Sequence, residues 1–564
     1  MDFKEMIAKD LAAVLGEQLS YEEILNLVEK PKMSSHGDYS FPVFSLSKVQ
    51  RKAPNVIAEE LSKEVSTDNY EQIVPTGGYV NFFLKKAEVS NHVLNDVLKE
   101  KEHYGDSTFG QKKNVVIDLS SPNIAKPMSM GHLRSTVIGN SIAELAGKLG
   151  YNPIKINHIG DWGTQFGKLI VAYKKWGDEA KVKADPISEL LSLYVYFHEQ
   201  VEEHPELDDQ GREWFKKLED GDPEAVELWT WFREESLKEF QKVYDMLGIE
   251  FDSYNGEAFY NDKMDPVIDI LTEQNLLISD DGADIVDLEK YDLNPALIRK
   301  SDGATLYITR DLAAAKYRKD NYDFEECIYV VGNEQSIHFK QLKGVLKEMG
   351  YEWSDDIKHI PFGLITSNGK KLSTRKGNVI LLEEVLNEAI DATQNIINEK
   401  NPSLENKEEV AHQVGVGAVI FHDLKNDRMN TFDFNLDHII QFEGETGPYI
   451  QYTRSRCESI LRKANWSAPS TEGNYALSDE GSWEVVKALY SFPDKVMEAY
   501  KKYEPSVIAK YLIDLSQKFN KYYAKAKILE DDNEKDSRLA LVYSVSVVIK
   551  EGLRLLGIQS PDNM

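Results

Sequence analysis

The 564-residue sequence contains only two cysteines, Cys327 and Cys457. Two thiols can build neither a disulfide framework nor a four-thiolate zinc site. We therefore expect no structural metal bound by the protein, and any essential metal ion should arrive with a substrate. The chain also lacks a run of roughly 18 or more consecutive apolar residues, which a membrane-spanning helix would need.

The N-terminus has neither the basic block nor the apolar block of a secretory signal peptide. It begins with Met1-Asp2-Phe3-Lys4-Glu5-Met6. We therefore expect a cytoplasmic protein with no membrane partner. Since a chain of this length is too long for one compact core, about two to four domains are expected.

An excess of positive charge is missing as well, because the formal net charge is −29. Cationic side chains that neutralise phosphates supply most of the affinity for nucleic acid, so this balance at first argues against such a partner. The distribution matters more, because residues 441–564 hold 17 Lys and Arg against 18 Asp and Glu, which leaves −28 for the first 440 residues.

Basic and aromatic residues are interleaved near the end of the chain. Residues 487–527 carry nine lysines against four acidic residues, together with eight tyrosines and phenylalanines. Stacking aromatics among cations suit an RNA surface. An amphipathic helical bundle whose lysine stems cover apolar surface would give the same composition.

The pattern of predicted elements changes twice along the chain. Residues 1–110 mix helices with short strands and read as a small α+β domain, whereas residues 386–564 read as almost entirely helical. Between them, the order strand, helix, strand is typical of a parallel nucleotide-binding sheet. A charged, Trp-rich stretch at about 173–250 reads as a helical insertion in this middle region. Helices are predicted at 3–19, 56–65, 132–149 and 537–556, and strands at 79–84, 114–119, 153–157, 304–309, 327–331 and 359–364.

The first chemical signal is the segment SSPNIAKPMSMGHLRST at residues 120–136, which joins a predicted strand to a predicted helix. A triphosphate site needs donors at a helix N-terminus, a small residue where the backbone approaches the nucleotide, and a cation for the developing charge. Gly131 is the small residue, and His132 and Lys126 can supply the positive charge. A Gly-His pair at a helix start is also common in proteins that bind no nucleotide.

The second signal is the segment NGKKLSTRKGN at residues 368–378. A lysine loop flanked by glycines can close over phosphates and stabilise charge that grows in the transition state. By itself, such a string is more often a solvated basic turn.

A third segment, SDGATLYITRDLA at residues 301–313, places Tyr307 and Asp311 four residues apart. They share one face if the strand predicted here turns into a helix. The carboxylate of Asp311 could pair in fork geometry with a planar guanidinium. An acid that favours the dipole of a helix start is the plainer interpretation of Asp311.

Together these segments resemble the class I aminoacyl-tRNA synthetases in their arginine-specific form. Residues 129–132 are similar to the family's His-x-Gly-His, with Ser129 in place of the first histidine. Residues 371–374 are similar to Lys-Met-Ser-Lys, with Thr374 in place of the last lysine. Further similar segments lie at 157–167, 329–339, 443–452 and 537–541, so the resemblance covers nearly the whole chain.

The resemblance implies a fold and an activity. The fold is of the α/β class: residues 111–385 form a Rossmann-type parallel-sheet catalytic domain with the helical insertion, residues 1–110 an α+β domain that contacts tRNA, and residues 386–564 an all-helical anticodon-binding domain. The activity is that of an arginine–tRNA ligase, which uses ATP with Mg²⁺, L-arginine and tRNA(Arg) and has no DNA partner.

The resemblance also implies roles for individual residues. Catalysis falls to His132, Lys126 and Lys371, with Lys126 compensating for the lysine missing at Thr374. ATP binding falls to Pro122, Ser129, Gly131, His132, Lys371 and Ser373. Arginine binding falls to Asp118, Asn123, Tyr307, Asp311 and Gln335. RNA contacts fall to Tyr449, Arg454, Lys501, Lys502 and Tyr522.

Two other functions are compatible with these residues. One is a synthetase for a different amino acid, although Asp311 suits a cationic side chain better than glutamate or glutamine, and two cysteines exclude a zinc-thiolate pocket for cysteine. The other is a non-catalytic tRNA-binding protein with a decayed site, suggested by Ser129 and Thr374. Pyrophosphate exchange measured with each amino acid distinguishes all three.

Overall fold

The computed structural model describes residues 2–371, 374–375 and 378–564, with side chains throughout these ranges except within 370–379. The chain forms two compact units. The first consists of Met1–Lys101, Leu461–Tyr490 and Lys518–Ser544, and the second of Glu102–Ile460, Ser491–Gln517 and Val545–Met564.

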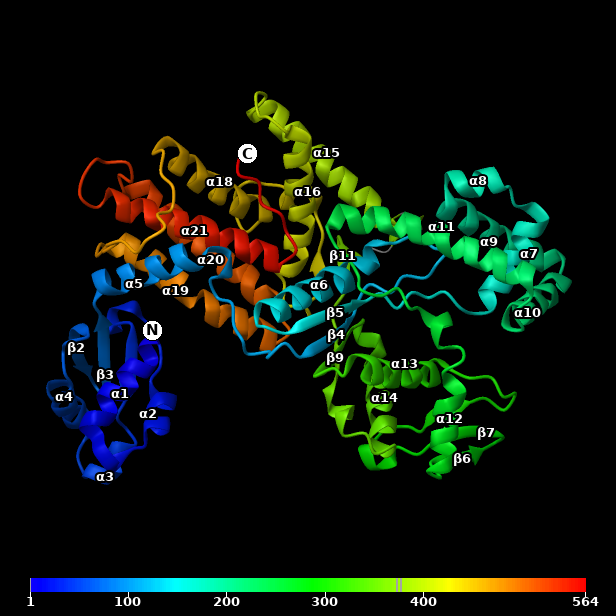
Figure 1. The fold of residues 1–564 in the computed structure, drawn as a ribbon, viewed down its shortest axis with the longest axis horizontal. Coiled ribbons are helices and arrows are strands. Elements are labelled where there is room, and N and C mark those ends of the chain that lie inside the picture. Colours follow the sequence, from blue (N-terminus) through cyan, green and yellow to red (C-terminus); the bar gives the residue numbers. More distant parts are fainter. Residues whose placement is uncertain (1, 372–373, 376–377) are drawn as a thin grey trace. The chain divides into compact units, whose positions relative to one another are not determined.

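The N-terminal part of the first unit is a small α+β fold (Figure 1). Its antiparallel sheet has the order β1-β3-β2, with β1 (Tyr39–Pro42), β2 (Tyr70–Thr76) and β3 (Tyr79–Leu84). Its helices are α1 (Phe3–Leu15), α2 (Tyr21–Leu27), α3 (Leu46–Gln50), α4 (Pro54–Glu64) and α5 (Lys86–Glu100). The predicted strand at 79–84 is confirmed. The helix predicted to reach Leu19 ends at Leu15, where Gly16 turns to a positive φ of 57°.

The second unit is built on a parallel sheet of four strands in the order β10-β9-β4-β5. The strands are β4 (Asn114–Asp118), β5 (Asn152–Ile156), β9 (Glu326–Val330) and β10 (Ile357–Ile360). The chain adds β5 on one side of β4 and later adds β9 on its other side. In open parallel sheets, ligands bind outside the carboxyl ends of strands at such a switch point. The ends of β4 and β9 therefore mark where the site should lie.

One face of this sheet is covered by helices that share its core. Val116, Cys327 and Ile357 from three neighbouring strands are fully buried and pack against apolar residues of the covering helices. These helices are α12 (Met264–Glu273), α13 (Tyr307–Tyr322) and α14 (Ser336–Glu348). A three-stranded antiparallel sheet lies beside them and consists of β6 (Leu277–Asp280), β7 (Ala283–Val286) and β8 (Ala296–Arg299).

The strand predicted at 304–309 is wrong. The chain turns there, with Gly303 at a φ of 82° and the Lys300 N–H bonded to the Ala304 oxygen, and α13 begins at Tyr307. Ile308 and Thr309, two of the β-branched residues that suggested a strand, are instead buried in the first turn of the helix, where Thr309 Oγ1 donates to the Ile298 oxygen at 2.7 Å. The strand predicted at 359–364 lies slightly earlier, at Ile357–Ile360.

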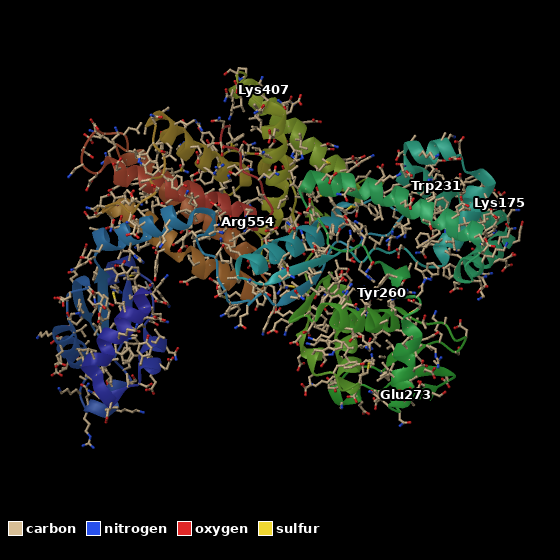
Figure 2. All side chains as sticks on the ribbon, in the orientation of Figure 1. Lys175, Trp231, Tyr260, Glu273, Lys407 and Arg554 are labelled. Atoms are coloured by element: carbon tan, nitrogen blue, oxygen red, sulfur yellow. The ribbon has the colours of Figure 1, made fainter. Side chains whose placement is uncertain are left out.

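Helix α6 (Leu133–Lys148) follows β4 and confirms the helix predicted at 132–149. The helical insertion is also confirmed. It consists of α7 (Thr164–Trp176), α8 (Glu179–Ala184), α9 (Pro186–Glu203), α10 (Glu206–Glu219) and α11 (Pro223–Leu247). Aromatic residues join its helices: Trp231 of α11 stands edge-on to Tyr173 of α7, with ring centroids 5.3 Å apart (Figure 2).

Helices dominate the rest of the chain, as predicted. They are α15 (Leu382–Lys400), α16 (Lys407–Leu424), α17 (Leu436–Ile439), α18 (Gly447–Lys463), α19 (Glu480–Lys501), α20 (Ser506–Lys525) and α21 (Lys535–Leu555). The short strands near the lysine segment are β11 (Ile365–Ser367), β12 (Lys370–Lys371), β13 (Thr374–Arg375), β14 (Asn378–Val379) and β15 (Phe432–Asp433). The domain boundary predicted after residue 385 falls inside α15. The three-domain division stays a prediction.

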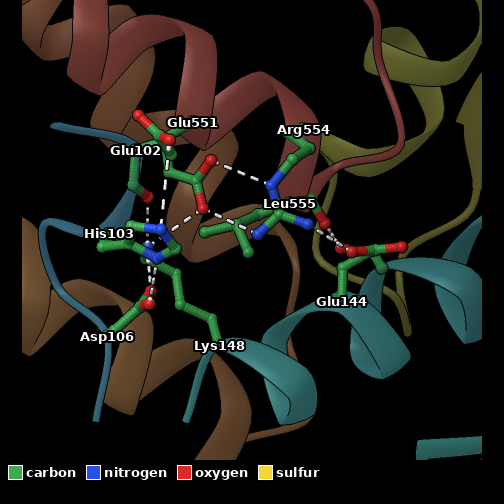
Figure 3. A network of polar contacts seen from close by, with 9 residues as sticks. Glu102, His103, Asp106, Glu144, Lys148, Glu551, Arg554 and Leu555 are labelled. Carbon is green, nitrogen blue, oxygen red and sulfur yellow. Dashed lines mark hydrogen bonds and ion pairs between the residues drawn. The ribbon is translucent and has the colours of Figure 1, made fainter. Parts of the chain in front are cut away.

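A buried ionic network fastens the end of α21 to α6 within the second unit (Figure 3). The Lys148 ammonium is fully buried, and its three donors are used by Glu551 at 2.9 Å, Asp106 at 2.8 Å and the Glu102 carbonyl at 3.2 Å. Ser141 Oγ adds a bond to the Leu555 carbonyl. The helix that follows the first chemical signal is thereby fixed to the last helix of the chain.

Among the helices that the structure describes, none is both long enough and apolar enough to cross a bilayer.

Candidate active site

The loop that leaves β4 is built on left-handed backbone. Ser120, Ser121 and Ala125 have φ values of 72°, 52° and 60°. Residues with a Cβ adopt left-handed backbone at a cost of about 1–3 kcal/mol each. They keep this conformation only where the surrounding structure holds them in it. Such strain is concentrated at functional sites, and here it falls at the carboxyl end of the central strand.

Side chains from three other elements fix this backbone. The N–H of Ser120 donates to Ser135 Oγ of α6 at 2.9 Å, and the N–H of Ser121 donates to Asn157 Oδ1 after β5 at 3.1 Å. The N–H of Ala125 donates to Ser236 Oγ of α11 at 3.0 Å. The loop therefore takes its shape from the helix that follows it, from the next strand and from the insertion.

The end of this loop presents one histidine in a defined tautomer. A short 3₁₀ turn, Met130–His132, precedes α6, and the Ser129 N–H donates to His132 Nδ1 at 3.0 Å. Because Nδ1 accepts this hydrogen, Nε2 carries the ring proton and is a donor. Burial lowers the pKa of His132, so the ring is neutral at pH 7. A neutral donor at a helix start suits a phosphate oxygen.

The remaining residues of the first segment lie around this turn. Asn123 and Lys126 are exposed and Pro122 is buried, while Ser129 Oγ accepts the Gly131 N–H at 3.3 Å. Asn123 lies directly against Gly160, because a Cβ built there would come within 1.8 Å of Asn123 Oδ1. A larger residue at position 160 would force the Asn123 side chain to move.

Residues 380–382, which follow the lysine segment, lie next to the first segment in space. The Met130 N–H donates to the Ile380 carbonyl, and the Leu382 N–H donates to the Met128 carbonyl, both at 3.0 Å. Residues 128–130 are thus paired with residues 380–382. Lys371 belongs to β12, but its side chain and all of Ser373 lie outside the described residues.

The residues predicted to bind arginine gather at the starts of two neighbouring helices. Tyr307 opens α13 and is 72% exposed, and Asp311 lies one turn later on the same helix. Asp311 Oδ2 pairs with His338 Nε2 of α14 at 2.5 Å. Gln335 is exposed at the turn where α14 begins, just beyond the end of β9. These side chains lie beside the switch point of the sheet.

Asp118 differs from the other predicted arginine ligands, because its carboxylate is engaged within the protein. It is buried, and its two oxygens accept from Arg318 Nη2 at 2.9 Å and Ser121 Oγ at 3.0 Å. Arg318 is itself only 1% exposed. The pair connects the end of β4 to α13 and to the strained loop.

Glu257 is a candidate that the sequence reasoning missed. Burial raises its pKa to about 7; the nearby carboxylates of Asp161 and Asp311 act in the same direction, and the Arg310 guanidinium opposes them. Glu257 begins a short 3₁₀ turn that ends at Tyr260, which is labelled in Figure 2. The Tyr260 ring is edge-on to the ring of Tyr317 in α13. Asp161 and Asp311 therefore lie within electrostatic range of Glu257, together with the guanidinium of Arg310. No sequence motif around residue 257 indicates that Glu257 lies near Asp161 and Asp311.

A buried carboxylate joins the insertion to the site. Asp161 accepts from Arg233 Nε at 2.9 Å and from the Ala258 N–H at 2.8 Å, while its carbonyl accepts from Trp229 Nε1 at 2.8 Å. Arg233 and Trp229 lie on α11, one helical turn apart. The segment at 157–167 therefore has a structural task, which is to seat the insertion beside Glu257.

The five residues predicted to contact RNA have different environments. Lys501 and Lys502 are exposed and Tyr449 is half-buried. Arg454 is 4% exposed and donates to the Ser560 carbonyl and to Asp562, and Tyr522 is equally buried. An RNA contact at each of the five stays a prediction, and the two buried side chains have packing roles whether or not RNA is bound.

The lysine-rich stretch is less basic than its composition indicates. Lys495 and Lys502 both pair with Glu498, and Lys510 pairs with Asp427. Lys487 pairs with Glu484, and Lys527 lies 4.0 Å from Glu530. Much of the positive charge of this stretch is therefore balanced by neighbouring carboxylates.

Three protein families together match most of the chain. Residues 93–436 match the family described as tRNA synthetases class I (R), catalytic domain. Residues 450–564 match the DALR anticodon binding domain, and residues 1–84 match the arginyl tRNA synthetase N terminal domain.

Similar full-length proteins carry the same description. The chain is 65% identical to the arginine–tRNA ligase of Enterococcus faecalis and 62% identical to that of Ligilactobacillus salivarius, each over 564 residues and all of both chains. Among solved structures, it resembles Thermus thermophilus arginyl-tRNA synthetase, with a TM-score of 0.81, 25% identity and full coverage of both chains. It also resembles the Plasmodium falciparum arginyl-tRNA synthetase, with a TM-score of 0.80, 26% identity and coverage of 99% and 98%.

Proposed function

Because this chain belongs to the class I arginyl-tRNA synthetases, we propose that it activates L-arginine with ATP and transfers the arginine to the 3′ end of tRNA(Arg) in the cytoplasm. It is an ATP-dependent aminoacyl-tRNA ligase. The observation that best supports the residue roles below is the backbone pairing of residues 128–130 with residues 380–382. It joins the segment that carries His132 to the segment that carries Lys371.

Activation is an in-line displacement at the α-phosphorus of ATP. A carboxylate oxygen of arginine forms the new bond, the bond to the pyrophosphate oxygen breaks, and pyrophosphate leaves. Little covalent work falls to the protein, which positions the reactants and neutralises charge. His132 donates Nε2–H to a phosphate oxygen, and Lys126 and Lys371 supply positive charge. Pro122, Ser129, Gly131 and Ser373 shape the nucleotide site around them.

Mg²⁺ enters the site with the nucleotide. Among residues 2–371, 374–375 and 378–564, no group of three or more His, Cys, Asp or Glu side chains is placed to hold a metal ion. When bound, Mg²⁺ neutralises negative charge on the triphosphate.

Recognition of arginine rests on the acidic cluster beside the sheet edge. Asp311 pairs with the guanidinium, Tyr307 and Gln335 orient it, and Asn123 holds the amino-acid end of the substrate. Glu257 provides a second acid. Asp118 supports the loop that carries Asn123, because its carboxylate accepts hydrogen bonds from Arg318 and from Ser121 of that loop.

Transfer follows at the terminal adenosine of the tRNA. Its 2′-hydroxyl attacks the carbonyl carbon of arginyl-adenylate, the ester bond forms, and AMP leaves. The C-terminal helices bind the anticodon region of tRNA(Arg), where Tyr449, Lys501 and Lys502 are accessible contacts.

The proposed activity is tested by pyrophosphate exchange. With tRNA(Arg) present, we expect exchange with arginine and no exchange above background with the other amino acids. Measuring the arginine reaction with and without tRNA shows whether activation depends on the tRNA. Exchange driven by a different amino acid, or tRNA binding with no exchange at all, would contradict the proposal.

Lys126 should matter for activation and not for tRNA affinity. Lys126 is exposed and has no hydrogen bond or ion pair among the described residues, so its charge is available to a phosphate. Preorganised charge stabilisation is worth about 10²- to 10³-fold in rate. We expect Lys126→Ala to lower the exchange kcat by about that factor with an unchanged tRNA Kd. Near-normal turnover would assign the positive charge elsewhere.

Asp311 should set discrimination against uncharged analogues. Citrulline has nearly the shape of arginine but no positive charge, and polar sites reject analogues lacking the matching group by about 10⁴-fold. We expect Asp311→Asn to lower kcat/KM for arginine and to narrow this discrimination. Competitive exchange with tRNA present measures both. His338→Gln is the matched control, because it removes the imidazole next to Asp311 and keeps the carboxylate.

Glu257 should make arginine binding sensitive to pH. Its pKa is raised to about 7, so the carboxylate is charged above pH 7 and neutral below it. Only the charged form attracts a guanidinium. We therefore expect the arginine KM to rise as the pH falls from 8 to 6, and the Glu257→Gln variant to have a higher KM that varies less with pH. An identical pH profile in the variant would remove Glu257 from the arginine site.

A further inference from the structure

The lysine segment is held to the first signature at its C-terminal flank by direct backbone bonds. These are the pairs between residues 128–130 and 380–382. Its N-terminal flank belongs to a different sheet, in which β11 pairs with β12 on one side and with β15 on the other. Both flanks must be fixed if the segment is to approach a nucleotide bound at His132.

The N-terminal flank is packed closely against residues 428–433. The Gly363 N–H donates to the Arg428 carbonyl at 2.8 Å, and the Phe434 N–H donates to the Thr366 carbonyl at 2.8 Å. A Cβ at Gly363 would come within 2.7 Å of the Asn430 carbonyl oxygen, so the two backbones touch. The position of residues 362–369 is therefore set by the position of residues 428–433.

Arg134 holds residues 428–433 to helix α6. It lies two residues after His132, and its side chain is almost fully buried. Nη1 donates to the Asn430 carbonyl at 2.9 Å, and Nε donates to Asp423 Oδ1 of α16 at 3.2 Å. The guanidinium also lies over the rings of Phe432 and Phe362, 4.9 and 5.9 Å from their centroids.

Stability alone does not account for this buried charge. Burial raises the pKa of Asp423 to about 6 even though Arg134 favours its charged form. Arg134 Nη2 and Asp423 Oδ2 have no hydrogen-bond partner among the described residues. Well-packed apolar residues are often as stabilising as such a pair. Apolar residues cannot make the directional contacts of a guanidinium, which here hydrogen-bonds to the Asn430 carbonyl and lies over the Phe432 ring.

We propose that Arg134 is a positioning residue for arginine activation, because it fixes the β11–β15 strand pair, and with it the N-terminal flank of the lysine segment, against the helix that begins at His132. The inference rests on the proposed roles of His132 and Lys371. Arg134 touches neither reactant in this scheme. It acts through the placement of Lys371.

A double-mutant cycle with Lys371→Ala tests this role. Displacing a reacting group by about 1 Å can cost about 10²-fold in rate. We expect Arg134→Lys, which keeps the charge and loses the planar fork, to lower the exchange kcat by about 10²-fold with a smaller change in the ATP KM. In the Lys371→Ala background, the same substitution should cost less than about threefold, because the group it positions is absent.

Matched variants separate positioning from general damage. Asp423→Asn preserves the volume of the acid and should reproduce part of the loss in exchange kcat seen with Arg134→Lys. In a double-mutant cycle with Lys371→Ala, its coupling energy should have the same sign as that of Arg134→Lys. Glu551→Gln alters a buried ion pair at the far end of α6, and its effect should be equal in both backgrounds. Transfer from preformed arginyl-adenylate requires no displacement of pyrophosphate, so Arg134→Lys should leave its single-turnover rate within about threefold of wild type. Thermal midpoints are measured for every variant.

The outcomes discriminate between the two levels of the proposal. Equal losses from Arg134→Lys in both backgrounds, or a transfer rate that falls as far as the exchange rate, would overturn the positioning role and leave the role of Lys371 intact. A Lys371→Ala enzyme with normal exchange would overturn the proposed role of Lys371 and the inference with it.

Discussion

The turn that the backbone makes after β4 is the constraint on which the rest of the site depends. Three residues there adopt left-handed conformations that their side chains disfavour. The turn is maintained by hydroxyl and amide groups of Ser135, Asn157 and Ser236, which belong to three different parts of the second unit. The shape of the loop at the sheet edge is thus a property of the assembled unit. It does not exist in the isolated strand-loop-helix segment.

The elements whose sequence pattern is local were predictable. The strand at 79–84 buries Val80, Phe82 and Leu84 with Asn81 between them, β4 and β9 are short continuous buried runs typical of parallel strands, and α6 is a buried helix. The error at 304–309 has the same origin, because β-branched and aromatic residues favour a strand locally while tertiary packing places them in α13. Motifs indicated the candidate site residues, because the resemblance covers nearly the whole chain, and the roles of these residues stay predictions.

Partners could not be predicted. Asp118 pairs with a residue 200 positions away and Arg134 with one 289 positions away, and no local signal connects them. For the same reason, the sequence did not reveal that the Asp118 carboxylate pairs with Arg318, and its contact with arginine stays a prediction. Glu257 was missed because its significance comes from Asp161 and Asp311, which reach it only in the folded chain. The charge of the lysine-rich stretch likewise depends on a partner that its own sequence does not show, because Lys510 pairs with Asp427 of a distant segment.

The attachment of α11 through Asp161 bears on how this architecture can evolve. Trp229 donates to the Asp161 carbonyl and Arg233 donates to its carboxylate, which also accepts the N–H of Ala258, the residue after Glu257. Deleting α7–α11, or exchanging them for the helices of a distant homologue, would leave the buried carboxylate of Asp161 without its guanidinium partner. The insertion is therefore not a detachable module. Its sequence and that of the sheet edge must change together, so chimaeras should be joined outside this pair of contacts.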